Sequence, residues 1–267
     1  MFNRQALIKR VDNYLSSKLR QLGLEAGGVL SIVIPVQEIH LRSLPGIQED
    51  WFFWDRPSED ETILGIGTAK AVTASGLGRL EKIGRTMQDM HDRWEWLDLE
   101  QTGLRPLSYI CFAFNQDDSM RAPWNGLPNS GMFLPELTLH QRDNCCAAAF
   151  SINLQVTRDR ETIQQRWMEL FRTLITSISQ PHSPPGCKTA LTITSASPDR
   201  NHWRNLVQSA QTSISSGSLK KVVLARQLNV QAQRRFDPRQ LMSTLSYLYP
   251  NSALIATHMG KGIFVSA

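Results

Sequence analysis

Residues 217–226 read GSLKKVVLAR, a glycine-containing turn followed by two lysines and an apolar, β-prone run. Aliphatic and β-branched residues in such a run predict a strand, which we place over residues 219–230. Because side chains alternate along a strand, Lys221 shares a face with Val223 and Ala225, while Arg226 lies on the opposite face. The stretch therefore predicts a strand that opens with a charged side chain.

A lysine at the start of an apolar strand can have a structural or a catalytic role. Desolvation lowers the pKa of an ammonium group, and a lysine brought toward neutrality can act as a general base. Most lysines at strand ends simply reach into water, and that role is favoured for both Lys220 and Lys221 on residue type alone. Lys221 is the stronger catalytic candidate of the two.

The sequence before residue 180 alternates between helical and strand periodicity. Apolar spacing predicts helices over residues 4–22, 77–97 and 159–178, the last capped by Asp159. Strands are predicted over 29–36, 108–114, 133–140 and 147–156, and a hairpin over 51–69 with its turn at 57–60. The glycines at 65 and 67 lack the context of a phosphate-binding loop and predict close backbone packing.

Residues 181–188 contain three prolines and a glycine and form the clearest predicted linker. It separates a predicted N-terminal region, residues 1–180, from a second region, residues 189–267. A helix from 198 to about 215, the strand over 219–230, a helix from 237 to 250 and a hairpin of 253–258 with 263–267 follow. The last strand has no stop signal, so we expect the chain to be the N-terminal part of a longer protein.

Composition narrows the class of protein. The chain has 267 residues, 41% hydrophobic residues and a net charge of +5, and no apolar run suits a membrane span or a secretory signal. Basic residues are scattered, which disfavours a nucleic-acid binder, although a non-catalytic binding module stays open as an alternative. The four cysteines show no CxxC spacing and no secretory signal precedes them, which favours reduced thiols and a cytoplasmic location. No histidine motif suits a zinc site.

KVVLAR after a helix and a glycine turn resembles the signature of the chorismate-utilising enzymes, and within them of the isochorismate synthases. Further pieces resemble the family's pattern in the same order, over roughly residues 29–267. They are Phe52-Phe53-Trp54 with Leu64-Gly65-Ile66-Gly67, Phe112-Ala113-Phe114, Trp124, Phe133-Leu134-Pro135-Glu136-Leu137, and Gly262-Ile263-Phe264-Val265-Ser266-Ala267.

The resemblance implies an α+β fold of layered antiparallel β-sheets with outer helices. It implies that chorismate is the substrate and that Lys221 is the general base, activating water for attack at C2 with loss of the 4-hydroxyl. It also implies Mg²⁺ in the full-length protein, with the general acid and the magnesium ligands beyond Ala267. We therefore expect an isomerase as the parent protein and a fragment that is inactive alone.

Several alternatives stay open at this stage. A salicylate synthase shares the lysine, whereas ammonia-using relatives such as anthranilate synthases typically carry glutamine there. The pathway is that of menaquinone, phylloquinone or a siderophore, and the oligomeric state is undetermined. For three other candidates a structural role is favoured over a catalytic one. They are Arg226 in an ion pair, His258 in the core or at the surface, and Asp237 as a helix cap.

Overall fold

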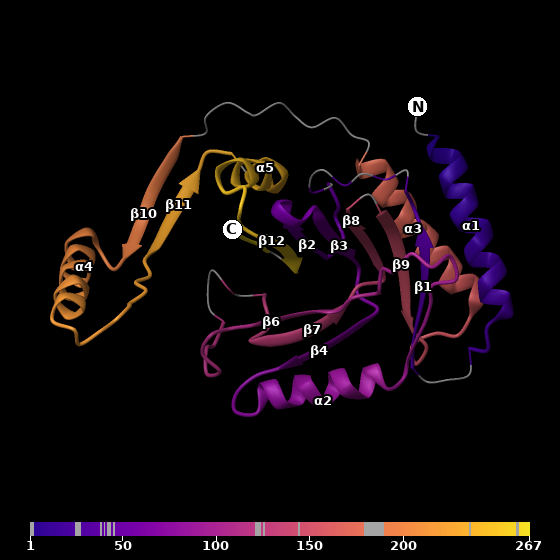
Figure 1. Ribbon diagram of the computed structural model, residues 1–267, viewed down its shortest axis with the longest axis horizontal. Coiled ribbons are helices and arrows are strands. Elements are labelled where there is room, and N and C mark those ends of the chain that lie inside the picture. Colours follow the sequence, from indigo (N-terminus) through magenta and orange to yellow (C-terminus); the bar gives the residue numbers. More distant parts are fainter. Residues whose placement is uncertain are drawn as a thin grey trace. The chain divides into compact units, whose positions relative to one another are not determined.

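A computed structural model describes most of the chain (Figure 1). The described residues are 3–24, 28–37, 39, 41, 44, 46–120, 124, 126–143, 145–178, 190–234, 236–259 and 262–267. They form two compact units, the first comprising Met1–Pro181 and Leu241–Ala267 and the second His182–Gln240. This division differs from the predicted regions 1–180 and 189–267, because the last 27 residues return to the first unit. The predicted linker at 181–188 lies outside the described residues.

An eight-stranded sheet forms the centre of the first unit. Neighbouring strands are antiparallel except for one parallel pair at the edge, β1 with β5. In order, the strands are β13 (Gly262–Ser266), β12 (Leu254–Met259), β2 (Trp51–Arg56), β3 (Glu61–Ile66), β8 (Leu137–Arg142), β9 (Cys145–Asn153), β1 (Val29–Pro35) and β5 (Trp94–Leu97). A short 3-10 helix at Pro57–Glu59 makes the predicted turn between β2 and β3. The predicted α+β class is confirmed.

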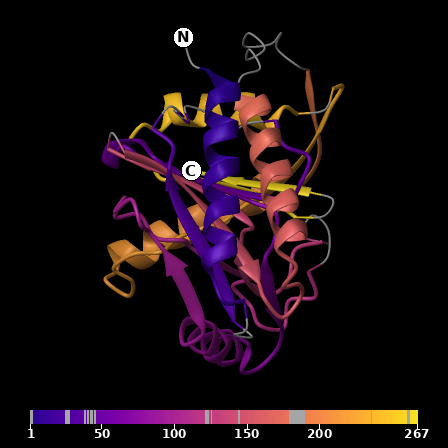
Figure 2. The same cartoon turned by 90° about the vertical axis from the view of Figure 1, so that its right-hand side faces the viewer.

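Helices α1 (Arg4–Gln21) and α3 (Arg160–Ile178) lie side by side over one face of this sheet (Figure 2). Both helices were predicted from their apolar spacing, and their apolar faces enter one core with the sheet. Leu15, Trp167 and Phe171 are among its fully buried side chains. Each such side chain contributes about 1.5–3 kcal/mol through its burial. Periodicity therefore located the layer that covers the sheet.

A second, three-stranded sheet in the first unit has the order β4 (Lys70–Ala74), β7 (Ser130–Leu134), β6 (Tyr109–Phe112). Helix α2 (Arg79–His91) packs against β4 and β7 through Ile83 and Met90 (Figure 1). Two glycines, Gly65 in β3 and Gly67 just after it, lie against the connection between the two sheets. A Cβ on Gly65 would come within 2.5 Å of Pro135, and a Cβ on Gly67 would come within 2.3 Å of Glu136. The predicted close packing at these glycines is confirmed.

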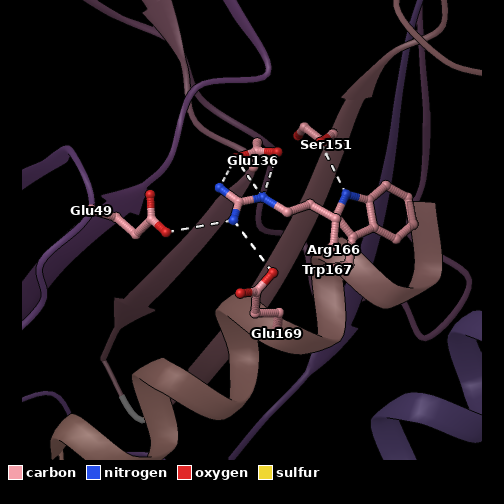
Figure 3. Close-up of polar contacts among 6 residues, drawn as sticks. All are labelled: Glu49, Glu136, Ser151, Arg166, Trp167 and Glu169. Carbon is pink, nitrogen blue, oxygen red and sulfur yellow. Dashed lines mark hydrogen bonds and ion pairs between the residues drawn. The ribbon is translucent and has the colours of Figure 1, made fainter. Parts of the chain in front are cut away.

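Helix α3 is fixed to the sheet by polar contacts as well as by its apolar face (Figure 3). The guanidinium of Arg166 donates to both carboxylate oxygens of Glu136, at 2.7 to 3.2 Å, and lies 3.5 Å from Glu49. Hydrogen bonding by Glu136 raises the pKa of Arg166 above its ordinary value. Next to it, the Trp167 indole donates to the carbonyl of Ser151 at 3.1 Å. Asp159 accepts from the amide of Thr162 at 2.8 Å, so its predicted capping role is confirmed.

Two predictions within the first unit are wrong. The helix expected over residues 77–97 spans only Arg79–His91, and Trp94–Leu97 form β5 instead. Backbone pairing with β1 and an indole hydrogen bond from Trp94 to Ser31, 2.9 Å, override the helical periodicity. The strand expected over 133–140 is two strands in different sheets, because Pro135 interrupts it and cannot donate a ladder hydrogen bond.

The second unit consists of a two-stranded antiparallel sheet and a helix. Strands β10 (Leu191–Ser197) and β11 (Gln227–Ala232) pair, and α4 (Arg200–Ser215) follows β10. Strand β10 was not predicted, and Asp199 caps α4 by accepting from the amides of Asn201 and His202. Helix α5 (Pro238–Leu248) begins at the end of this unit and continues into the first. The strand predicted over 219–230 is wrong before Gln227, since residues 221–226 have no strand pairing.

Candidate functional site

Lys221 lies in the unpaired segment between α4 and β11. Both Lys221 and Lys220 are exposed within the second unit, so that unit by itself does not supply the partly dry environment expected for the base. The structure gives neither lysine a distinguishing contact among its described neighbours. The catalytic role of Lys221 therefore stays a prediction.

The segment that carries Lys221 is nevertheless held at both ends. After α4 the chain turns through Gly217, whose φ of +75° favours glycine. The amide of Leu219 and the hydroxyl of Ser218 both donate to the carbonyl of Ser213, at 3.1 and 2.8 Å. At the other end Arg226 donates to the carbonyl of Pro198 at 3.0 Å. These contacts fix the backbone on both sides of Lys221, while its side chain is exposed.

The other sequence candidates have structural contacts. Arg226 is half-buried and makes the hydrogen bond described above. The pKa of Asp199 is lowered mainly by the backbone hydrogen bond from His202, and the positive charge of Arg226 adds to this shift. His258 stacks on Trp51, with ring centroids 6.1 Å apart, and lies 3.5 Å from Asp50. His258 therefore has the structural role favoured for it, whereas the ion pair expected for Arg226 stays a prediction, since the described contact of its side chain is the hydrogen bond to the Pro198 carbonyl.

Asp237 has the predicted role of a helix cap. Its carboxylate accepts from the backbone amide of Arg239 at 2.9 Å, in the first turn of α5. The same carboxylate forms an ion pair with the Arg239 side chain at 3.1 Å. It is therefore committed to the start of the helix.

Among the described residues, no group of three or more His, Cys, Asp or Glu side chains could hold a metal ion. The Mg²⁺ implied by the resemblance therefore stays a prediction. Several carboxylates are instead engaged in ion pairs and caps, such as Glu136, Asp159 and Asp237. Within the same described residues, no helix is long and apolar enough to span a membrane.

A cavity of about 630 Å³ lies in the first unit, and sequence reasoning did not identify it as a cavity. Its lining is almost entirely apolar and aromatic. Six of its residues belong to pieces that carry the family resemblance: Phe52, Phe112, Ala113, Phe114, Trp124 and Phe264. That resemblance was the signal that could have found it, because the pieces are far apart in sequence and meet here.

The geometry of the cavity combines stacking with a fixed wall. Tyr109 stacks on Phe52 with ring centroids 4.4 Å apart, and burial raises the pKa of the Tyr109 hydroxyl and of the Cys111 thiol. Arg79, 6% exposed, donates to the carbonyls of Ala113 at 2.6 Å and Asn115 at 3.0 Å, which holds the loop after β6. Among the described residues of the lining, Asp118 is the one that carries a charge.

Comparison with known proteins identifies the family. The chain belongs to the chorismate binding enzyme family, whose model matches residues 17–267. Among solved structures, it is similar to MenF, the menaquinone-specific isochorismate synthase from Escherichia coli, with 20% identity and a TM-score of 0.60. That match covers 96% of this chain and 54% of MenF, so the chain spans about half the length of that structure.

Two further comparisons add no argument. A protein named DhbC, from Bacillus anthracis, matches with 14% identity and a TM-score of 0.42, covering 94% of this chain and 47% of DhbC. No curated protein sequence matches the chain. The likeness to MenF supports the fold, and the family match supports a chorismate-utilising enzyme.

Proposed function

We propose that the protein containing this chain is an isochorismate synthase, which converts chorismate to isochorismate. One observation carries the proposal within the family: a lysine, Lys221, stands directly before Val222-Val223-Leu224-Ala225-Arg226. The resemblance assigns that position to the residue that activates the nucleophile, and lysine there implies water. The fold shared with MenF is consistent with this assignment.

In the proposed reaction, the neutral amine of Lys221 takes a proton from a water molecule that attacks C2 of chorismate. The 4-hydroxyl then leaves and requires a proton from a general acid. Lysine acts as a base only when its amine is neutral, and exclusion of water favours that form. Since Lys221 is exposed here, the proposal requires bound substrate or other parts of the protein to cover it.

We extend the proposal to Mg²⁺ in the whole protein, where the ion would neutralise charge on the substrate carboxylate. The described residues include no group of three or more His, Cys, Asp or Glu side chains that could hold a metal ion, so we assign no ligand and no step to Mg²⁺ in this chain. A cytoplasmic location is part of the same proposal and is supported by the cysteine pattern. The pathway served, of menaquinone, phylloquinone or a siderophore, is left open.

Product analysis tests the proposal against its closest rivals. The protein containing this chain is incubated with chorismate and Mg²⁺, and the products are separated by chromatography and identified by NMR. Isochorismate as the main product is the expected result. Salicylate with pyruvate would identify the salicylate synthase alternative, and unchanged chorismate at saturating enzyme would favour a binding module.

A further inference from the structure

The two units differ sharply in charge. Residues 182–240 of the second unit include nine Lys and Arg but only two Asp and no Glu, whereas the rest of the chain has 20 basic and 22 acidic residues. The net charge of the second unit is therefore +7, against −2 for the first. The overall value of +5 conceals this separation.

Both acidic residues of the second unit are already engaged. Asp199 accepts from the amides of Asn201 and His202 at 2.9 and 2.8 Å, and Asp237 pairs with Arg239 at 3.1 Å. Five basic side chains are exposed in the described part of this unit: Arg200, Arg204, Lys220, Lys221 and Arg234. Since the unit has no third carboxylate, its surface is positive on balance.

Helix α4 adds to this potential. Arg200 is its first residue and Arg204 lies four residues later, so the two like charges are neighbours on the helix surface. The amino end of a helix already carries a partial positive charge, which basic residues there oppose. Helices α2 and α3 have an acidic residue in the first turn, Glu81 and Glu161, whereas α1, α4 and α5 have none.

We infer that the positively charged surface of the second unit attracts the anionic substrate toward Lys221. This inference rests on the proposed function, in which chorismate, a dicarboxylate, is the substrate and Lys221 belongs to the same unit. A positive field around a site raises the local concentration of an anion and its association rate, by about 10- to 10³-fold in steered systems. Exposed charges act over about 10 Å at moderate salt, so the effect must weaken as salt is added.

Charge reversal with a matched control tests the inference in the protein that contains this chain. Arg200→Glu with Arg204→Glu changes two exposed residues at the start of α4. Arg4→Glu with Lys9→Glu makes the same charge change at the start of α1, where both residues are exposed in the first unit. Chorismate turnover is measured for both variants and the wild type at low and at high salt.

We expect the α4 variant to lose about 10-fold in kcat/KM at low salt, with kcat unchanged and most of the difference gone at high salt. The α1 variant should stay within about two-fold of wild type. Equal salt dependence in the two variants would overturn the inference. So would tight binding of a single-stranded oligonucleotide at physiological salt that only the α4 variant loses, because the surface would then serve nucleic acid.

The inference can fail separately from the proposed function. If no variant turns over chorismate, binding of phthalate, an unreactive aromatic dianion, is followed by NMR chemical shifts on the 267-residue chain. The expected shifts are centred on residues of the second unit and become smaller as salt is added. They should also be smaller in the α4 variant but not in the α1 variant, and this result would support the anion-attracting surface independently of the proposed function. Shifts of equal size in all three proteins would exclude it.

Discussion

Glu136, in the turn between β7 and β8, accepts three hydrogen bonds from Arg166 on α3, and this pair ties the connection between the two sheets of the first unit to α3. Glu136 is 13% exposed at its side chain. We expect Glu136→Gln to lower the free energy of unfolding by about 1.5 kcal/mol, because a charge-assisted pair is lost. Urea denaturation followed by tryptophan fluorescence measures this.

Glu169 provides the control for that measurement. It lies 3.6 Å from the same guanidinium, but its side chain is 68% exposed. Exposed ion pairs contribute about 0–1 kcal/mol, so Glu169→Gln should change stability little. Equal losses for the two substitutions would show that burial does not determine the strength of these pairs.

Protonation of Asp55 should stabilise the first unit as the pH falls. Burial raises the pKa of Asp55 above its ordinary value, 3.8, while the hydrogen bond from Thr62, 2.8 Å, opposes the shift. The folded state therefore favours the protonated form, and the cost of the charge is present above the folded pKa and disappears below 3.8. Asp55→Asn should raise the melting temperature at pH 7 and have no effect at pH 3. A lower melting temperature at pH 7 would contradict this.

Lys221 should be distinguishable from its neighbour by turnover. In the protein that contains this chain, Lys221→Ala should lower kcat by about 10²-fold or more, the usual scale for a lost general base. Lys220→Ala is the matched control, since both residues are exposed in the same segment, and it should have a mild effect. Circular dichroism checks that both variants are folded. Small and equal effects on kcat would remove Lys221 from the mechanism.

The nucleophile provides an independent prediction. If Lys221 activates water, a large excess of ammonium should leave isochorismate the main product of chorismate and Mg²⁺. The control is Lys221→Gln, which places here the residue typical of ammonia-using relatives and should lose isochorismate formation. Mass spectrometry of the products measures both. An aminated product as the main species from the wild type would refute the water mechanism.

The 267-residue chain by itself should not turn over chorismate. Lys221 is exposed, and the described residues include no cluster that could bind a metal. Catalytic groups act as a unit, so a base without its acid partner gives little rate. Strand β13 is also at an edge of the sheet, which favours self-association. Isochorismate formation above that of a Lys221→Ala chain would show that the active site lies elsewhere.

Local patterns predicted the elements whose stability is local, and failed where distant backbone decided the outcome. The stripes of α1 and α3 were predicted because one face of each helix enters the core. The apolar spacing of residues 94–97 continues that of a helix, yet these residues pair with β1 as a strand. The environment of Lys221 could not be predicted either, because alternation in a strand requires a partner strand and residues 221–226 have none in the structure.

The pairing of β2 with β12 can form only late in synthesis, because the two strands are far apart in the sequence. The hydroxyl of Thr257 bonds the carbonyl of Trp51, 206 residues apart in the sequence. At about 5–20 residues per second, a ribosome needs on the order of 10–40 s to make the intervening chain. During that time the apolar edge of β2 has no partner strand and the basic second unit emerges first. A nascent chain of this protein is therefore expected to need chaperone protection at residues 51–56 until β12 has been made.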